Sequence, residues 1–283
     1  MLSDLTIGQA LAAEGIDRGD AACLLRAVSG EKLARLIAHP GKMLPPQHAQ
    51  RFLELARRRR RGEPVAYLVG SREFYGLEFQ LSPATLIPRP ETELLVELAL
   101  ARIPDHAPQR VLDAGTGSGV VAIAIASLRP YAQLVAADVS EEALGVAAAN
   151  ARRLLPGRRQ LRFVESDWFD ALEGERFDLI VSNPPYVAAR DPHLEQGDLR
   201  FEPKAALVGG PDGLDAIRTL VSAAPSHLKP GGWLLFEHGY DQSQACHALL
   251  AAAGFSEVFD ERDLAGIPRV AGGRLLAGRM EAD

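Results

Sequence analysis

Short apolar runs alternate with longer helix-like stretches between residues 110 and 181. The runs are four or five residues long, which suits buried strands, and the stretches between them are long enough for helices. The expected strands are 111–114, 134–137, 161–164 and 177–181, with one helix ending at Leu128 and another beginning at Glu141. This alternation predicts an α/β fold, with a parallel sheet covered by helices on both faces.

The same pattern continues towards the C-terminus. A helix that ends near Leu228 precedes an apolar run at 233–237, which we interpret as a further strand. Two later runs, 255–259 and 274–278, are expected to close the sheet as an antiparallel pair.

The first 62 residues have a different pattern, in which leucines recur at helical spacing. Gly15, Gly30 and Pro40 separate the segments, and Pro45-Pro46 opens the last one, so a small helical domain is predicted. Its last helix runs into Arg57–Arg61. Two interpretations of these arginines stay open. They are a solvated helix C-terminus, which the helix dipole favours, or a docking patch for an acidic or RNA-bearing partner.

Between the two patterns, the runs 67–70 and 74–79 are expected to form a β-hairpin. Residues 86–93 then lead into an apolar helix at 94–103, where Pro90 suits the first helical position. The predicted organisation is a helical domain at 1–62, a hairpin linker at 63–84 and an α/β domain at 85–283.

Composition places the chain among ordinary globular proteins, with 47% hydrophobic and 24% charged residues. No apolar run approaches the roughly 18 residues of a membrane span, and the N-terminus lacks a signal-peptide pattern. Cys23 and Cys246 have no metal-binding or redox spacing, and the seven histidines are not clustered. We therefore expect a cytoplasmic protein with no membrane contact and no metal.

Charge is divided unevenly along the chain. Residues 1–62 contain 11 Lys and Arg against 6 Asp and Glu, whereas the remainder contains 20 against 31. This asymmetry indicates that the two parts meet different partners.

A glycine-rich turn follows the first expected strand of the sheet, with the sequence Gly115-Thr116-Gly117-Ser118-Gly119. Glycines allow close approach of the backbone to a ligand. A dinucleotide site has the spacing G-x-G-x-x-G, whereas this turn has the tighter G-x-G-x-G. The tighter form, with an acidic residue ending the next strand, is typical of S-adenosylmethionine enzymes.

Acidic and aromatic residues follow the next two expected strands. Asp138 ends the run 134–137, where its carboxylate is suited to two ribose hydroxyls. Asp167 and Trp168 follow the run 161–164, and offer a carboxylate for an adenine amino group and a ring beside the base. Because open α/β sheets bind ligands at the carboxyl ends of their strands, all these residues are predicted to meet at one cofactor site.

Asn183-Pro184-Pro185-Tyr186 follows the fourth strand and suits a site that handles a flat polar nitrogen. The Asn183 side chain has one acceptor and two donors. Each proline fixes the backbone and removes a donor, so that the carbonyl before each ring is free to point at a ligand.

With these residues in place, the chain resembles the bacterial release factor glutamine methyltransferases over nearly its full length. Seven motifs carry the resemblance: Glu63–Leu68, Leu86–Glu93, Gly115–Gly119, Ser166–Phe169, Asn183–Tyr186, Arg200–Pro203 and Glu237–Gly239. The resemblance implies a Rossmann-like class I methyltransferase sheet and an N-terminal domain that helps to engage the substrate.

The resemblance also implies the reaction. S-adenosylmethionine would donate a methyl group to the side-chain N5 of the glutamine in the Gly-Gly-Gln loop of class 1 peptide chain release factors, which modulates translation termination. The family places the cofactor against the residues matching Gly115–Gly119, Asp138, Trp168 and Asn183, and the glutamine against Asn183–Tyr186.

Our mechanistic hypothesis assigns catalysis to Asn183, Pro184 and Tyr186. An amide nitrogen is a poor nucleophile, because its lone pair is delocalised into the carbonyl. The Asn183 side-chain oxygen and the Pro184 carbonyl would accept hydrogen bonds from that nitrogen, while Tyr186 stacks on the flat amide. The roles of Glu202, Glu237 and His238 stay open, with a structural role favoured for each.

Three alternative functions are compatible with parts of the sequence. A DNA or RNA adenine methyltransferase uses a similar four-residue motif, but it carries a basic target-reading surface, and the part of this chain after residue 62 is acidic. A ribosomal-protein glutamine methyltransferase typically reads Arg-Ser-Pro where this chain has Arg89-Pro90-Glu91. A non-catalytic partner of the translation machinery is disfavoured by the intact Asn183–Tyr186. We expect a monomer with no direct nucleic-acid contact.

Overall fold

The computed structural model describes residues 5–157 and 160–276. Its contacts divide the chain into two compact units. The first contains residues 1–71 with 193–201, and the second contains residues 72–192 with 202–283. Among the described residues, the first unit has one buried apolar cluster and the second unit has two.

The first unit is helical. Its helices are α1 (Ile7–Leu11), α2 (Arg18–Ser29), α3 (Leu33–Ala38), α4 (Pro46–Arg60) and α5 (Val65–Val69). Leu24, Leu25 and Phe52 are fully buried between them. The helix expected after Pro45-Pro46 is confirmed, with Pro46 as its first residue.

Three arginines of the run at the end of α4 bind other segments of the same unit. Arg58 pairs with Glu63, and Arg60 donates to the Glu14 carbonyl. Arg59 bridges Asp20 at 2.6 Å and Asp198 at 3.0 Å, and so ties residues 193–201 to the helices. Arg57 and Arg61 are exposed, as expected of a solvated helix end.

The expected strand at 67–70 is wrong, because Val65–Val69 form the short helix α5. Pro64 precedes its first turn, and Gly70 ends it in the left-handed conformation at φ 78°. Leu68 packs into the core of the first unit. Burial of this apolar turn outweighs the strand preference of Tyr67 and Val69.

The hairpin is shorter than expected and consists of β1 (Ser71–Phe74) and β2 (Leu77–Gln80). Both residues of its turn have positive φ, 50° at Tyr75 and 72° at Gly76. Such a turn matches the right-handed twist of a two-residue hairpin. Phe74 and Phe79 are buried and pack edge-on against each other.

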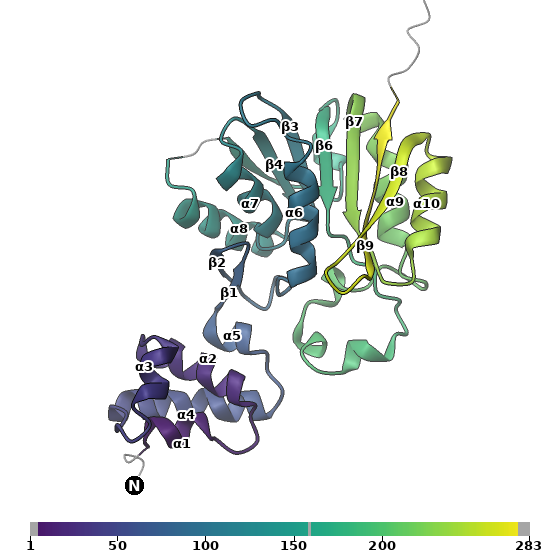
Figure 1. Ribbon diagram of the computed structural model, residues 1–283. Helices are drawn as coiled ribbons and strands as arrows, with labels where there is room; N and C mark the ends of the chain where they lie inside the picture. Colours follow the sequence, from purple (N-terminus) through teal and green to yellow (C-terminus); the bar gives the residue numbers. More distant parts are fainter. Residues whose placement is uncertain (1–4, 158–159, 277–283) are drawn as a thin grey trace, which may run out of the picture. The chain divides into compact units, whose positions relative to one another are not determined.

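The second unit has a seven-stranded sheet of order β5-β4-β3-β6-β7-β9-β8. Figure 1 shows β4, β3, β6 and β7 one after another in this sheet. The strands are β3 (Arg110–Ala114), β4 (Gln133–Asp138), β5 (Leu161–Glu165), β6 (Phe177–Ser182), β7 (Leu228–Glu237), β8 (Phe255–Arg262) and β9 (Pro268–Leu275). Strands β3 to β7 are parallel, and β9 runs antiparallel to both of its neighbours. The predicted α/β fold is confirmed, and so is the antiparallel closing pair. The expected strand 255–259 lies within β8, but its partner β9 begins at Pro268 rather than at Arg274, and Gly278 lies outside the described residues.

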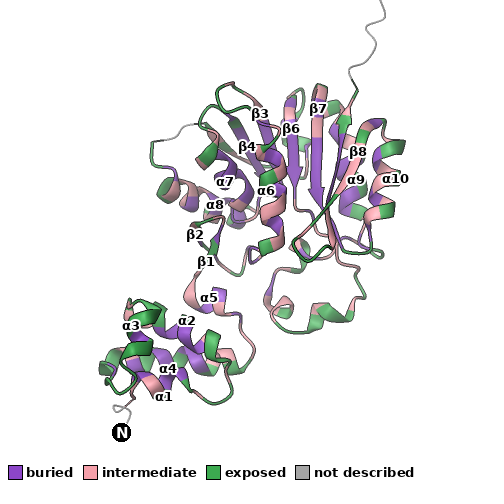
Figure 2. Cartoon of the chain, in the orientation of Figure 1, coloured by how far each residue is buried: buried purple, intermediate pink, exposed green. Residues whose placement is uncertain are grey.

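Helices cover both faces of this sheet. Side chains of α6 (Glu93–Leu100), α7 (Val120–Leu128) and α8 (Glu141–Leu154) pack on one face. Side chains of α9 (Asp215–His227) and α10 (Ser243–Ala252) pack on the other. The central strands are buried on both sides (Figure 2), which explains their continuous apolar runs.

The chain order reverses beside β3, since β4 lies on one side of it and β6 on the other. Open α/β sheets bind ligands at such a point, outside the carboxyl ends of the strands. Gly115, Asp138 and Asn183 lie at the carboxyl ends of β3, β4 and β6. This topology therefore brings together residues that are far apart in the sequence.

Candidate active site

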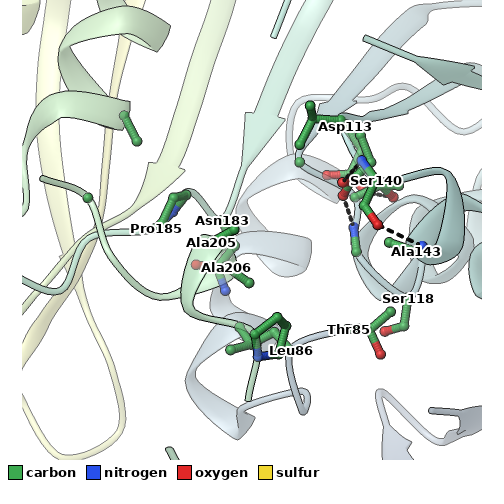
Figure 3. Close-up of a pocket in the computed structure, with 18 of the residues that line it drawn as sticks. Thr85, Leu86, Asp113, Ser118, Ser140, Ala143, Asn183, Pro185, Ala205 and Ala206 are labelled. Carbon is green, nitrogen blue, oxygen red and sulfur yellow. Dashed lines mark hydrogen bonds between the residues drawn. The ribbon is translucent and has the colours of Figure 1, made fainter. Parts of the chain in front are cut away.

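A cavity of about 480 Å³ lies at this edge of the sheet. Its size falls in the usual range for small-molecule sites, about 300–1,000 Å³. Residues of the loop after β6 and of the segment 205–206 line one side, and Asp113, Ser118, Ser140 and Ala143 line another (Figure 3). The predicted site residues that line it are Gly115, Thr116, Gly117, Ser118, Asp138, Asp167, Trp168, Asn183 and Pro185.

The three glycines of the turn after β3 have different surroundings. Gly115 and Gly117 have φ values of 75° and 56°, and an added Cβ would meet no atom within 4 Å at either position. At Gly119, which has a φ of 84°, a Cβ would lie 2.9 Å from Ile123 and 3.1 Å from Ala147. Gly119 does not line the cavity, and its small size allows α7 to pack against α8.

Asp138 holds the glycine turn through its carboxylate. Its Oδ2 accepts a hydrogen bond from the Gly117 N–H at 2.8 Å, and Oδ1 accepts from the Ser140 N–H at 3.0 Å. Each carboxylate oxygen has a further lone pair. Asp138 therefore orders the turn and still has acceptor capacity for a ligand.

Asp113 is a cavity residue that the sequence interpretation missed. Its carboxylate, 1% exposed, accepts hydrogen bonds from the Thr116 hydroxyl at 2.7 Å and the Ala122 N–H at 3.1 Å. Burial raises the pKa of Asp113 to about 6, although the two hydrogen bonds act to lower it. A charged residue within the otherwise apolar run 111–114 was the available signal.

Trp168 lines the cavity with its backbone in the left-handed region, at φ 49°. A non-glycine residue there carries strain of about 1–3 kcal/mol, which the surroundings must offset. The Ser166 hydroxyl holds this turn, since it donates to the Trp168 carbonyl and accepts from the Ala171 N–H. Asp167, which is exposed, also lines the cavity.

The Asn183 amide has one satisfied end and one unsatisfied end. Its Nδ2 donates to the Thr92 hydroxyl at 3.1 Å. Its Oδ1 is shielded from water and accepts no hydrogen bond from any described residue. A buried acceptor without a donor costs about 1–3 kcal/mol. Because Asn183 lines the cavity, this oxygen is suited to receive a donor from a ligand.

Glu237 connects Thr92 and Tyr186 beneath the cavity. The Thr92 hydroxyl donates to one carboxylate oxygen at 2.6 Å, and the Tyr186 hydroxyl donates to the other at 2.9 Å. Glu237 is 1% exposed, and burial raises its pKa. Burial and the adjacent Glu237 also raise the pKa of Tyr186, which therefore remains a hydrogen-bond donor.

Pro184 and Tyr186 do not line the cavity. Pro184 is buried, and the Tyr186 hydroxyl is directed to Glu237. The stacking of Tyr186 on a substrate amide remains a prediction. His238 is fully buried and contacts Asp260 and the Gly239 carbonyl, which is a structural environment away from the cavity.

Glu202 joins two of the sequence motifs. Its buried carboxylate pairs with Arg89 and accepts a hydrogen bond from the Ile87 N–H at 2.9 Å. Leu86, Pro88 and Arg89 line the cavity, so that Glu202 fixes part of the cavity wall. The structural role favoured for Glu202 agrees with these contacts.

Comparison with known proteins identifies the family. Residues 7–70 match the family model of the PrmC N-terminal domain, and residues 91–198 match that of the methyltransferase small domain. A release factor glutamine methyltransferase of Burkholderia pseudomallei is 52% identical, over 96% of this chain and 97% of its own. The chain belongs to the release factor glutamine methyltransferase family. The resemblance inferred from the motifs is confirmed.

Two further comparisons agree. A release factor glutamine methyltransferase of Xylella fastidiosa is 52% identical, over 94% of this chain and 96% of its own. The solved structure of a methyltransferase from Pyrococcus furiosus has a TM-score of 0.54 and 18% identity, and the match covers 79% of this chain and 98% of that one. At that identity the likeness shows the fold alone, which is the class I methyltransferase fold.

Family and fold together make this chain an S-adenosylmethionine-dependent methyltransferase. The cavity fits such a methyl donor, because it offers a glycine turn with open space, the Asp138 carboxylate and the Trp168 side chain. Over residues 5–157 and 160–276, no helix is long and apolar enough to cross a membrane.

Proposed function

We propose that this enzyme methylates the side-chain N5 of the glutamine in the Gly-Gly-Gln motif of class 1 peptide chain release factors. The relatives named above support the protein substrate. The unpaired Oδ1 of Asn183 is the observation that supports the chemistry. A primary amide carries two N–H donors, and this oxygen is an unpaired acceptor on a residue that lines the cavity.

One group of residues around the cavity would bind the methyl donor. Gly115, Gly117, Asp138, Asp167 and Trp168 would hold S-adenosylmethionine, which supplies an electrophilic methyl group on a sulfonium sulfur. Thr116 and Ser118 belong to the same turn and line the same cavity. Gly119 would contribute by allowing the packing of α7 rather than by contact.

Asn183 and Pro184 would activate the substrate nitrogen by accepting its two N–H bonds. These hydrogen bonds favour a pyramidal nitrogen, whose lone pair is then directed at the methyl carbon. Among the described residues, no donor reaches the Pro184 carbonyl oxygen. As the C–N bond forms, the bond between the methyl carbon and the sulfonium sulfur would break, and the sulfur would leave with the electron pair as a neutral thioether. The nitrogen would become cationic and lose one hydrogen as a proton to solvent. Positioning supplies most of the acceleration of such an in-line displacement.

The helical first unit would engage the release factor outside the Gly-Gly-Gln motif. Its match to the PrmC N-terminal domain supports this assignment. We expect the enzyme to act as a cytoplasmic monomer without direct contact to nucleic acid and without a metal.

The test is incubation of the purified enzyme with labelled S-adenosylmethionine and a purified class 1 release factor. We expect label in the release factor, and tandem mass spectrometry should place one methyl group on the Gly-Gly-Gln glutamine. A release factor in which this glutamine is replaced by alanine is the matched control. Label in DNA or a ribosomal protein, with none in the release factor, would contradict the proposal.

A further inference from the structure

The two ends of the Asn183 amide have the same shape and opposite hydrogen-bonding character. In one orientation the oxygen is available to a substrate, and in the other the NH₂ group takes its place. An NH₂ group facing the N–H bonds of a substrate amide would leave donors opposed to donors. The reaction under "Proposed function", on which this inference rests, therefore requires one of the two orientations.

The contacts of Thr92 select that orientation. A hydroxyl has one hydrogen to donate, and Thr92 donates it to Glu237 at 2.6 Å. Towards Asn183 the hydroxyl then offers lone pairs only. It must accept from the Asn183 NH₂ group at 3.1 Å, and this leaves Oδ1 as the free end.

Glu237 determines which groups donate and which accept in the hydrogen bonds that join it, through Thr92, to Asn183. An ionised carboxylate accepts at both oxygens and donates at neither. Its two oxygens accept from Thr92 and from Tyr186 at 2.6 and 2.9 Å. Glu237 does not line the cavity, so that its effect on the Asn183 amide passes through Thr92.

We propose that Glu237 is a positioning residue, which acts through the Thr92 hydroxyl to hold the Asn183 amide with its oxygen available to the substrate. The Tyr186 hydroxyl satisfies the second oxygen of Glu237 and completes the arrangement. The electrostatic surroundings of the carboxylate are Arg269, which stabilises its charge, and Glu91, which opposes it.

Thr92→Val and Thr92→Ser form a matched pair that separates positioning from packing. Valine keeps the shape of threonine without the hydroxyl, whereas serine keeps the hydroxyl without the methyl group. Thr92 is 2% exposed, and a residue that acts only by packing would therefore tolerate valine better than serine. The positioning role predicts the reverse order for kcat.

We expect Thr92→Val to lower kcat for release factor methylation at least about tenfold, with less than threefold change in KM and in the calorimetric Kd for S-adenosylmethionine. Thr92→Ser should keep kcat within about threefold of wild type. Thermal unfolding checks that both variants are folded. If Thr92→Ser lost more kcat than Thr92→Val, the positioning role would be overturned.

Glu237→Gln is the second test, and it applies even where Thr92→Val does not fold. Glutamine satisfies the Tyr186 hydroxyl best with its oxygen, which turns its NH₂ group towards Thr92. The Thr92 hydroxyl would then donate to Asn183 and reverse its amide. We expect kcat to fall at least about tenfold at unchanged S-adenosylmethionine affinity. Wild-type kcat in Glu237→Gln would overturn the inference.

These outcomes are separate from failure of the proposed function. If the wild-type enzyme leaves the release factor unmethylated, the proposed function fails. If the wild-type enzyme methylates the release factor but Thr92→Val keeps a higher kcat than Thr92→Ser, only the positioning role of Glu237 fails.

Discussion

Glu202 forms an ion pair with Arg89, although 113 positions separate them in the sequence. The Glu202 side chain is fully shielded from solvent, and the same carboxylate accepts the Ile87 N–H. Two motifs that look unrelated in the sequence are therefore one structural unit beside the cavity.

We predict that Glu202→Gln lowers the free energy of unfolding by about 1–3 kcal/mol, because the new NH₂ group would oppose either the Arg89 guanidinium or the Ile87 N–H. Chemical denaturation measures this change. The exposed Glu173 offers the same substitution as a control, and Glu173→Gln should stay within about 0.5 kcal/mol of wild type. Equal stability of the two variants would show that Glu202 does not fix this wall.

Gly117 and Gly119 should respond differently to alanine. Both have positive φ, so both substitutions carry backbone strain of about 1 kcal/mol or more. Only at Gly119 does the new methyl group meet neighbours, Ile123 and Ala147. We predict that Gly119→Ala lowers the melting temperature more, whereas Gly117→Ala weakens S-adenosylmethionine binding more. Thermal unfolding and titration calorimetry check the two effects, and the opposite ranking would refute the division of roles.

Asn183→Ala should remove the side-chain oxygen that we propose as an acceptor for the reacting nitrogen. We predict a fall in kcat of about 100-fold or more, by analogy with removal of one polar group from a preorganised site. The affinity for S-adenosylmethionine should stay within a few-fold, since the glycine turn and Asp138 are unchanged. Steady-state kinetics and calorimetry measure the two quantities. Retention of most of the activity would exclude the acceptor role.

Asp113 predicts a pH dependence of stability. Its pKa of about 6 lies above the ordinary value of 3.8, so that between these pH values the folded protein holds a proton that the unfolded chain has released. The contribution of Asp113 to the free energy of unfolding therefore falls as pH rises from about 4 to 6, by at most about 3 kcal/mol.

The measurement is chemical denaturation of wild type and Asp113→Asn across that pH range. Relative to the variant, wild type should lose stability as pH rises, and the difference should be constant above about pH 7. A difference that does not change with pH would show that Asp113 keeps its ordinary pKa.

Much of the sheet was predictable from the sequence, because strands buried on both faces require continuous apolar runs. The runs 111–114, 134–137 and 177–181 each coincide with an observed strand. Five residues such as 65–69 are too few to separate helix from strand by periodicity. At these residues a helix forms because Leu68 is buried in the core of the first unit, and the local sequence does not show this burial.

The cavity-lining residues at strand ends were predictable for a similar reason, since parallel strands bring their carboxyl ends to one edge. The contacts behind them were not. Thr92 lies inside a quoted motif and Glu237 inside another, but 145 positions separate them. Their hydrogen bond depends on how α6 and β7 pack, which no local pattern specifies.

The free oxygen of Asn183 has a consequence for the product of the proposed reaction. The two proposed acceptors, Asn183 Oδ1 and the Pro184 carbonyl, are both satisfied only when the substrate nitrogen carries two hydrogens. A primary amide has two, but the methylated amide has only one and must leave one acceptor empty. An enzyme built on this pair would hold its product less well than its substrate and would stop after a single methyl group.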